Sequence, residues 1–434
     1  MLSLFSGTLL GVLLLNDFAA LDSMEALYAL FYFLLTQSWI LHTLGFVILV
    51  GSIMALIEKS GGIEGFIDFV LHKQAFIASP RSALMLSYVL GVVIFIETSI
   101  TALISGAVGK PLCDKYKIPH AKLAFVCDST SAPIGSLVII NGYGALLLGL
   151  ITTQITEGNL QGNAFELLLS SIVYNFYAMS ALMVTFLFIW FHFDIGPMRN
   201  LQYKRSENYL VLEKKSMYLM LVPIFLMLLL VFVFLYITGD GNILKGSGSS
   251  SIFYTMQSVL VVMLFYYVGG KYMTFKEYAS TSYKGAKKLF SISLILVFAF
   301  AIGKVTSDLK TGQYLATLAQ GNLDVLFLSG MIFLLSAVIS FSTGTSWGTF
   351  SIMIPIAVPM AFGMDANIAL VIGAVISGGI FGDHCSPISD TTIISSMAAD
   401  CEVIEHVRTQ LPYALLSGVI AFFLFVLVSF VTTK

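Results

Sequence analysis

Two acidic, hydroxyl-rich runs, residues 128–133 and 383–390, interrupt otherwise hydrophobic segments of the chain. An ionised carboxylate near the centre of a bilayer costs ~2.5–3.5 kcal/mol on insertion scales, so acidic residues at that depth are usually functional. The alternative is that Asp and Ser side chains cap helix ends beside a break. We predict that four acidic residues take part in ion binding or proton coupling: Asp128, Asp383, Asp390 and Glu97.

Hydroxyl side chains crowd the same runs and a third one at residues 342–348. A small hard cation prefers oxygen ligands, so sodium fits this set better than zinc or copper, which prefer imidazole or thiolate. We therefore predict Na⁺ at Asp128, Asp383 and Asp390. The hydroxyl candidates around them are Ser129, Thr130, Ser131, Thr343, Thr345, Ser386, Ser389 and Thr391.

Broken helices present two kinds of polar end inside a membrane. Half-helix N-termini attract anions, whereas half-helix C-termini and freed carbonyls favour cations. The pattern therefore permits an organic anion with a coupling ion as well as a bare cation. Proton coupling requires a carboxyl group that burial or a nearby like charge keeps protonated. Asp383 with Asp390, or Asp383 with Asp128, could form such a pair, and competition between Na⁺ and a proton for one carboxylate would produce antiport.

Three further residues in or near the second run invite other interpretations. His384 and Cys385 could suggest a transition-metal site, but the first run has Ser129 and Thr130 at the corresponding positions, which disfavours it. His406 is predicted to be interfacial, with pH sensing as the alternative.

The composition places the chain in a bilayer. Of its 434 residues 58% are hydrophobic and only 11% are charged, and the mean hydropathy is +0.92. A net charge of −2 gives no support to nucleic-acid binding. The sequence has no hydrolase, Walker or dinucleotide motif, so we predict neither an enzyme nor a cofactor. The apolar N-terminus lacks a basic region and is interpreted as a retained membrane helix.

The distribution of basic residues predicts two re-entrant hairpins. Basic stretches at 198–215 and 270–288 are assigned to cytoplasmic loops. Residues 82–109 are too short for two spans although both flanks are basic, so we predict a hairpin with its tip at 97–99. The uncharged residues 325–363, interrupted by the run 342–348, predict a second hairpin from the opposite face.

A broken helix follows each hairpin, at 120–151 and 366–398, with the acidic runs as the breaks. The order repeats from opposite sides of the membrane, which predicts an all-α polytopic inverted repeat. Its halves are 1–195 and 217–434, joined by the cytoplasmic loop 196–216. Each half would begin with three scaffold helices. In the first these are 1–22, 24–37 and 40–57, and in the second 217–237, 252–268 and 289–303.

Several runs resemble the NhaC family of sodium/proton antiporters, over about residues 85 to 420. The most specific is the run from Gly382 to Thr392, followed by His406 to Tyr413. Similar runs are 122–124 with 128–133, 141–145 and 343–349. The resemblance adds Asn141 to the candidate binding residues and carries Asp128, Asp383 and Asp390 over as ion-binding positions.

The resemblance implies a multi-pass protein of the cytoplasmic membrane that exchanges Na⁺ or Li⁺ for H⁺. It also implies an elevator-like movement and a homodimer surrounded by lipid. Family members that exchange malate for lactate or carry amino acids leave an alternative open, namely a Na⁺- or H⁺-coupled transporter of small carboxylates or amino acids. A passive channel is the other alternative, which two hairpins from opposite faces disfavour.

Overall fold

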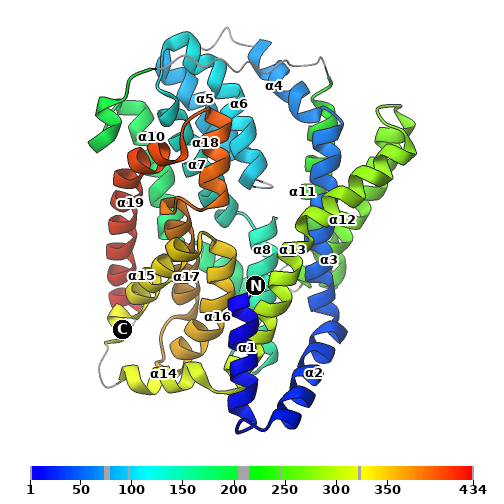
Figure 1. Cartoon of the computed structure of the whole chain (residues 1–434), viewed down its shortest axis with the longest axis vertical. Coiled ribbons are helices and arrows are strands. Elements are labelled where there is room, and N and C mark those ends of the chain that lie inside the picture. Colours follow the sequence, from blue (N-terminus) through cyan, green and yellow to red (C-terminus); the bar gives the residue numbers. More distant parts are fainter. Residues whose placement is uncertain are drawn as a thin grey trace.

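The computed structural model describes residues 2–72, 79–95, 98–139, 141–203, 215–243, 246–320 and 324–432. Within these ranges the secondary structure is helical and includes no strand (Figure 1). The first helices are α1 (Leu2–Leu15), α2 (Ala20–Thr36), α3 (Ser38–Lys59), α4 (Gly62–His72), α5 (Pro80–Val93), α6 (Thr98–Tyr116), α7 (His120–Leu137), α8 (Gly142–Thr156), α9 (Ala164–Ile172) and α10 (Phe176–Phe191). The remaining helices are α11 (Tyr218–Thr238), α12 (Gly248–Leu264), α13 (Phe275–Asp308), α14 (Thr311–Gln320), α15 (Val325–Thr343), α16 (Ser346–Gly363), α17 (Ile368–Cys385), α18 (Asp390–Ala399) and α19 (Val403–Thr432).

Nine helical segments in the described part of the chain are long and apolar enough to cross a membrane. Side chains such as Phe225, Phe423 and Val431 are exposed on them, as expected for surfaces that face lipid rather than water. The prediction of an all-α, multi-pass membrane protein is therefore confirmed.

Each predicted hairpin corresponds to two helices that follow one another in the chain. α5 and α6 form the first, in the upper part of Figure 1, and α15 and α16 form the second, in the lower part. Thr98 begins α6 as expected for a tip residue, whereas Glu97 lies outside the described residues. The second turn is made by Gly344 and Thr345, with Gly344 at φ +66°, a backbone conformation that favours glycine.

The second predicted helix break is correct and the first is misplaced. α17 ends at Cys385 and α18 begins at Asp390, so the break lies inside the acidic run. In the first half, α7 continues through residues 128–133 and ends at Leu137, and α8 begins at Gly142. Pro133 does not end the helix because membrane helices tolerate proline where neighbours satisfy the freed backbone groups.

This correction changes which positions correspond between the halves. α7 and α17 each contain 18 residues and each is followed by a gap of four before the next helix. Counted back from the break, Asp383 corresponds to Gly135, and Asp128 lies two helical turns earlier. The two acidic runs are therefore not equivalent in position. The division into two inverted repeats, 1–195 and 217–434, stays a prediction.

The predicted scaffold helices correspond to α1, α2 and α3 in the first half and to α11, α12 and α13 in the second. The predicted loop 270–288 is wrong for most of its length, because α13 begins at Phe275. A capping box starts it, in which Thr274 Oγ1 accepts from the Glu277 amide and Glu277 Oε2 accepts from the Thr274 amide. The connecting loop 196–216 contains a 3₁₀ turn at Gly196–Asn200, and residues 204–214 of it lie outside the described residues.

The hairpins and broken helices pack into one bundle beside the scaffold. α15 runs along α17, and the first hairpin contacts both α7 and α18, which comes from the other half of the chain. Gly378 and Gly382 permit the close α15–α17 contact, since a Cβ at either position would lie 2.2 or 2.1 Å from a carbonyl oxygen of α15. The bundle thereby brings residues from 128 to 410 into one buried region.

Candidate functional site

Asp128 is the centre of a buried polar network on α7. Its side chain is 0% exposed, although it sits in the middle of an apolar helix. One oxygen, Oδ2, accepts from Thr392 Oγ1 at 3.2 Å and from Gln410 Nε2 at 2.8 Å. The other oxygen, Oδ1, has no partner among the described residues. Asp128 thus joins α7 to α18 and α19.

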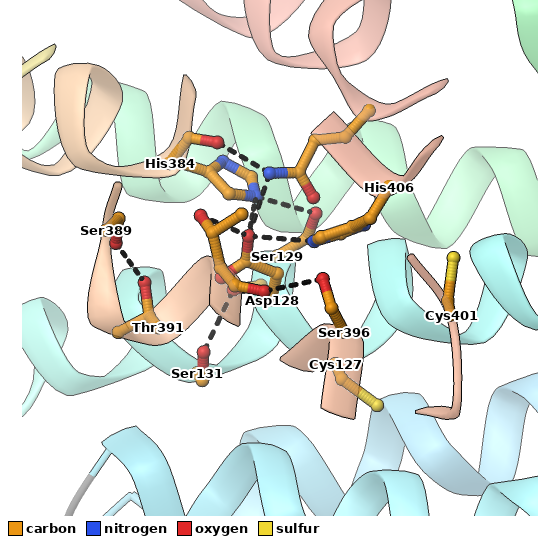
Figure 2. A network of polar contacts seen from close by, with 12 residues as sticks. Cys127, Asp128, Ser129, Ser131, His384, Ser389, Thr391, Ser396, Cys401 and His406 are labelled. Carbon is orange, nitrogen blue, oxygen red and sulfur yellow. Dashed lines mark hydrogen bonds and ion pairs between the residues drawn. The ribbon is translucent and has the colours of Figure 1, made fainter. Parts of the chain in front are cut away.

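Two buried histidines adjoin this carboxylate. His406 Nε2 lies 3.2 Å from Asp128 Oδ2, so the imidazole donates to the carboxylate through this nitrogen. His384 Nε2 lies 3.9 Å from the same oxygen and 3.2 Å from Ser129 Oγ, while its Nδ1 lies 2.6 Å from the Tyr177 hydroxyl. Figure 2 shows both imidazole rings turned toward Asp128 and Ser129. The interfacial prediction for His406 is wrong, since this side chain is fully buried.

Asp383 lies near the C-terminal end of α17 and is 1% exposed. Its Oδ2 accepts from Ser346 Oγ at 3.2 Å, and Ser346 Oγ lies 2.9 Å from the hydroxyl of Tyr143. Its Oδ1 has no partner within the described part of the protein. A buried carboxylate with one open oxygen is a group that a cation or a proton would stabilise.

The helix break beside Asp383 is held by short local contacts. The Ser386 amide donates to the Asp383 carbonyl at 3.0 Å, and Ser386 Oγ donates to the Phe341 carbonyl of α15 at 2.9 Å. Ser389 and Thr391 contact each other through their hydroxyls at 3.0 Å. Asp390 begins α18 and accepts from the Thr391 amide, but its side chain remains exposed.

Several predicted ligand side chains are used within the protein rather than directed at one ion. Thr130 and Thr343 donate to carbonyls one turn earlier, and Ser131 donates to the Asp128 carbonyl at 3.1 Å. Asn141 caps α8 and donates to the Gly135 carbonyl at 2.6 Å. Thr345 precedes α16, where its carbonyl accepts from Thr349. Of these residues, Asn141 is a helix cap, whereas Thr130, Thr343 and Ser131 make hydrogen bonds within their own helices.

The three predicted sodium carboxylates occupy different surroundings. Asp128 contacts His406 and lies near His384. Asp383 accepts a hydrogen bond from Ser346, the first residue of α16, and Asp390 is exposed. Across the described ranges, no group of three or more His, Cys, Asp or Glu side chains is placed to hold a metal ion. Any sodium here would therefore take hydroxyl and carbonyl oxygens as well as a carboxylate.

Sequence reasoning missed four residues of the site: Tyr143, Tyr177, Ser346 and Gln410. A signal existed for Gln410, because it follows His406 by four residues and so shares its helix face. Ser346 and Tyr143 lie in runs that resemble the family, but the sequence does not indicate that their side chains contact each other.

A sequence model described as "Na+/H+ antiporter family" matches residues 137–430. The chain belongs to this family. As a family member it is a secondary transporter and not an enzyme. A relative from Haemophilus influenzae, an uncharacterized protein, is 35% identical over 394 residues, which covers 85% of this chain and 75% of the relative.

Two further proteins resemble this family member. A Bacillus subtilis protein named malate-2H(+)/Na(+)-lactate antiporter is 32% identical over 162 residues, covering 36% of this chain and 34% of that protein. The crystal structure of the YdaH transporter of Alcanivorax borkumensis has a TM-score of 0.73 at 13% identity, covering 98% and 97% of the two chains. That likeness shows a shared fold.

Proposed function

We propose that the chain exchanges Na⁺ for H⁺ across the cytoplasmic membrane, with the Asp383 carboxylate alternately binding the ion and the proton. Membership of the Na⁺/H⁺ antiporter family supports these two ions. The observation that carries the residue assignment is the buried, half-partnered Asp383 carboxylate beside a helix break. Freed carbonyls at such a break favour a cation, and the open oxygen provides the charge that it needs.

Asp128 has a different part in this proposal. Its Oδ2 is occupied by donors from α18 and α19, so the carboxylate holds these helices against α7. We place it as a positioning residue whose open Oδ1 contributes negative charge to the ion site. Asp390, exposed at the start of α18, is the residue that a hydrated cation would meet first.

An elevator-type movement is the mechanism that we propose for alternating access. The bundle of hairpins and broken helices would move as one body against α3, α11, α12 and α13. Packing of the first hairpin on α18, from the other half of the chain, supports a rigid moving unit. A homodimer would anchor the scaffold in the membrane.

The direct experiment uses proteoliposomes loaded with acidic buffer. Addition of external Na⁺ should release internal protons from vesicles that contain the wild type, and Asp383→Asn should abolish this release. Asp324→Asn is the matched control, because Asp324 is an exposed N-cap at the far end of α15. Absence of proton flux with both Na⁺ and Li⁺ would refute the proposal.

The second candidate is a coupled exchanger of small carboxylates or amino acids. Similarity to the protein named malate-2H(+)/Na(+)-lactate antiporter favours it. Uptake of labelled malate, lactate and a set of amino acids into the same vesicles, with and without Na⁺, distinguishes the two functions.

A further inference from the structure

A pocket lies between the scaffold and the turns of both hairpins. The volume that a water-sized molecule can occupy in it is about 70 Å³. One wall is apolar and comes from α3 and α13, with Phe46, Val50 and Leu289. Tyr143 and Trp347 form the opposite side, and Asp390 lines the pocket as well. The pocket therefore combines hydrocarbon, aromatic rings, the polar side chains of Thr98 and Asn141, and one carboxylate.

The charge of the pocket selects against anions. Apart from the phenol of Tyr143, Asp390 is the one ionisable side chain among the described residues that line the pocket. No Lys, Arg or His is among these lining residues. A carboxylate ligand would have to lose water beside a negative charge without gaining an ion pair, which is unfavourable. Malate or lactate therefore does not suit this pocket.

A bare metal ion does not suit the pocket either. Na⁺ needs oxygen ligands around it, whereas most of the lining is hydrocarbon or aromatic carbon. The aromatic side offers a different kind of cation binding. The rings of Tyr143 and Trp347 pack against each other, with centroids 5.3 Å apart and an interplanar angle of 36°, so a cation would lie against the side of this pair that lines the pocket and not between the rings. Aromatic faces attract organic cations, and quaternary ammonium groups in particular.

We propose that this pocket binds a small organic ammonium ion, with its charged nitrogen toward Asp390 and Trp347 and its alkyl part against Phe46, Val50 and Leu289. The ammonium ion is a ligand additional to Na⁺ and H⁺. The pocket shares Tyr143 and Asp390 with the proposed Na⁺/H⁺ exchange, but binding of the ammonium ion requires neither the Asp383 carboxylate nor a proton gradient.

The test is a calorimetric titration of the purified full-length protein in Na⁺-free buffer. Choline is the probe, because its permanent charge cannot be lost and its neutral isostere, 3,3-dimethyl-1-butanol, is a matched control. Potassium malate is the anionic control. Choline should bind, whereas the isostere and malate should not. No binding of choline, or equal binding of choline and its isostere, would overturn the proposal, and so would binding of malate alone.

Two variants of the aromatic wall sharpen the test. Trp347→Leu keeps an apolar side chain but removes the ring, so choline affinity should fall roughly three- to tenfold or more, while Trp347→Phe should retain most of it. If size-exclusion chromatography shows that Trp347→Leu is not folded, Asp390→Asn replaces it as the test, because this variant removes the negative charge of the pocket. Unchanged choline affinity in a folded Leu or Asn variant would contradict the proposal. Choline binding by a protein without Na⁺-driven proton flux would refute the proposed exchange and not the pocket.

Discussion

His406 Nε2 lies 3.2 Å from Asp128 Oδ2, and neither side chain is exposed. The contact joins the middle of α7 to α19 through two residues that lie 278 positions apart in the chain. Thr392 and Gln410 donate to the same oxygen. One carboxylate oxygen therefore fixes the relation between both halves of the molecule.

Asp128→Ala should destabilise the protein strongly. The change leaves three buried donors without their acceptor, at about 1–3 kcal/mol for each one that water cannot reach. Thermal unfolding of the detergent-purified protein measures the effect. Asp22→Ala, at an exposed position in the first turn of α2, is the control and should unfold like the wild type. An unchanged unfolding temperature for Asp128→Ala would show that Asp128 does not hold the helices together.

Gly344→Ala should weaken the second hairpin turn for two reasons. A residue with a Cβ at φ +66° is strained, and that Cβ would lie 2.7 Å from Ile388 Cγ1 and 2.9 Å from its carbonyl oxygen. Gly158→Ala is a matched control, since Gly158 has φ +77° with nothing near its missing Cβ. We expect Gly344→Ala to lower the unfolding temperature more than Gly158→Ala does. Equal losses would mean that the Ile388 contact has no energetic role.

Tyr143→Phe should slow Na⁺-driven proton flux without unfolding the protein. The ring and its packing stay, but the hydroxyl that contacts Ser346, and through it Asp383, is lost. A hydrogen bond of about 1 kcal/mol corresponds to a roughly fivefold change in rate or affinity. Tyr88→Phe removes a hydroxyl that donates to the Leu182 carbonyl at 3.2 Å, away from Asp383, and it should transport normally. Wild-type flux in Tyr143→Phe would exclude the hydroxyl chain from the exchange.

Glu157 predicts a pH-dependent change in stability. It follows α8 directly, its side chain is 7% exposed, and burial raises its pKa from 4.5 to about 7, although Lys304 lies 3.9 Å away. Between these values the folded protein keeps a proton that the unfolded chain has released, so stability falls as pH rises from about 4.5 through 7. Glu157→Gln should therefore raise the unfolding temperature at pH 8 relative to wild type and have little effect at pH 4. A difference that does not vary with pH would contradict this assignment.

The fold could largely be predicted from the sequence because its strongest signals are local. The second hairpin appears as a long uncharged run with polar residues and Gly344 at its centre, and its helices end where those residues stand. The first helix break is predicted at the acidic run 128–133, whereas α7 continues through this run to Leu137. The break ends at Asn141, which caps α8, and Gly142, the first residue of that helix.

The site could be predicted only in part. Carboxylates in apolar helices stand out in any sequence, which is why Asp128 and Asp383 were found. His406 was misinterpreted because its partner lies on another helix, and one sequence does not reveal which helix faces meet. Several of the predicted hydroxyls donate to carbonyls of their own helices, as Ser and Thr in membrane helices commonly do, and their role as ligands stays a prediction.

The central claim is that one carboxylate, Asp383, binds either Na⁺ or a proton. The most direct measurement is proton release on Na⁺ binding to the purified protein, followed in weakly buffered solution at a pH where the carboxyl group is protonated. We predict that Na⁺ releases protons from the wild type and from Asp324→Asn, and releases none from Asp383→Asn. Sodium binding without proton release, or undiminished release from Asp383→Asn, would contradict the account.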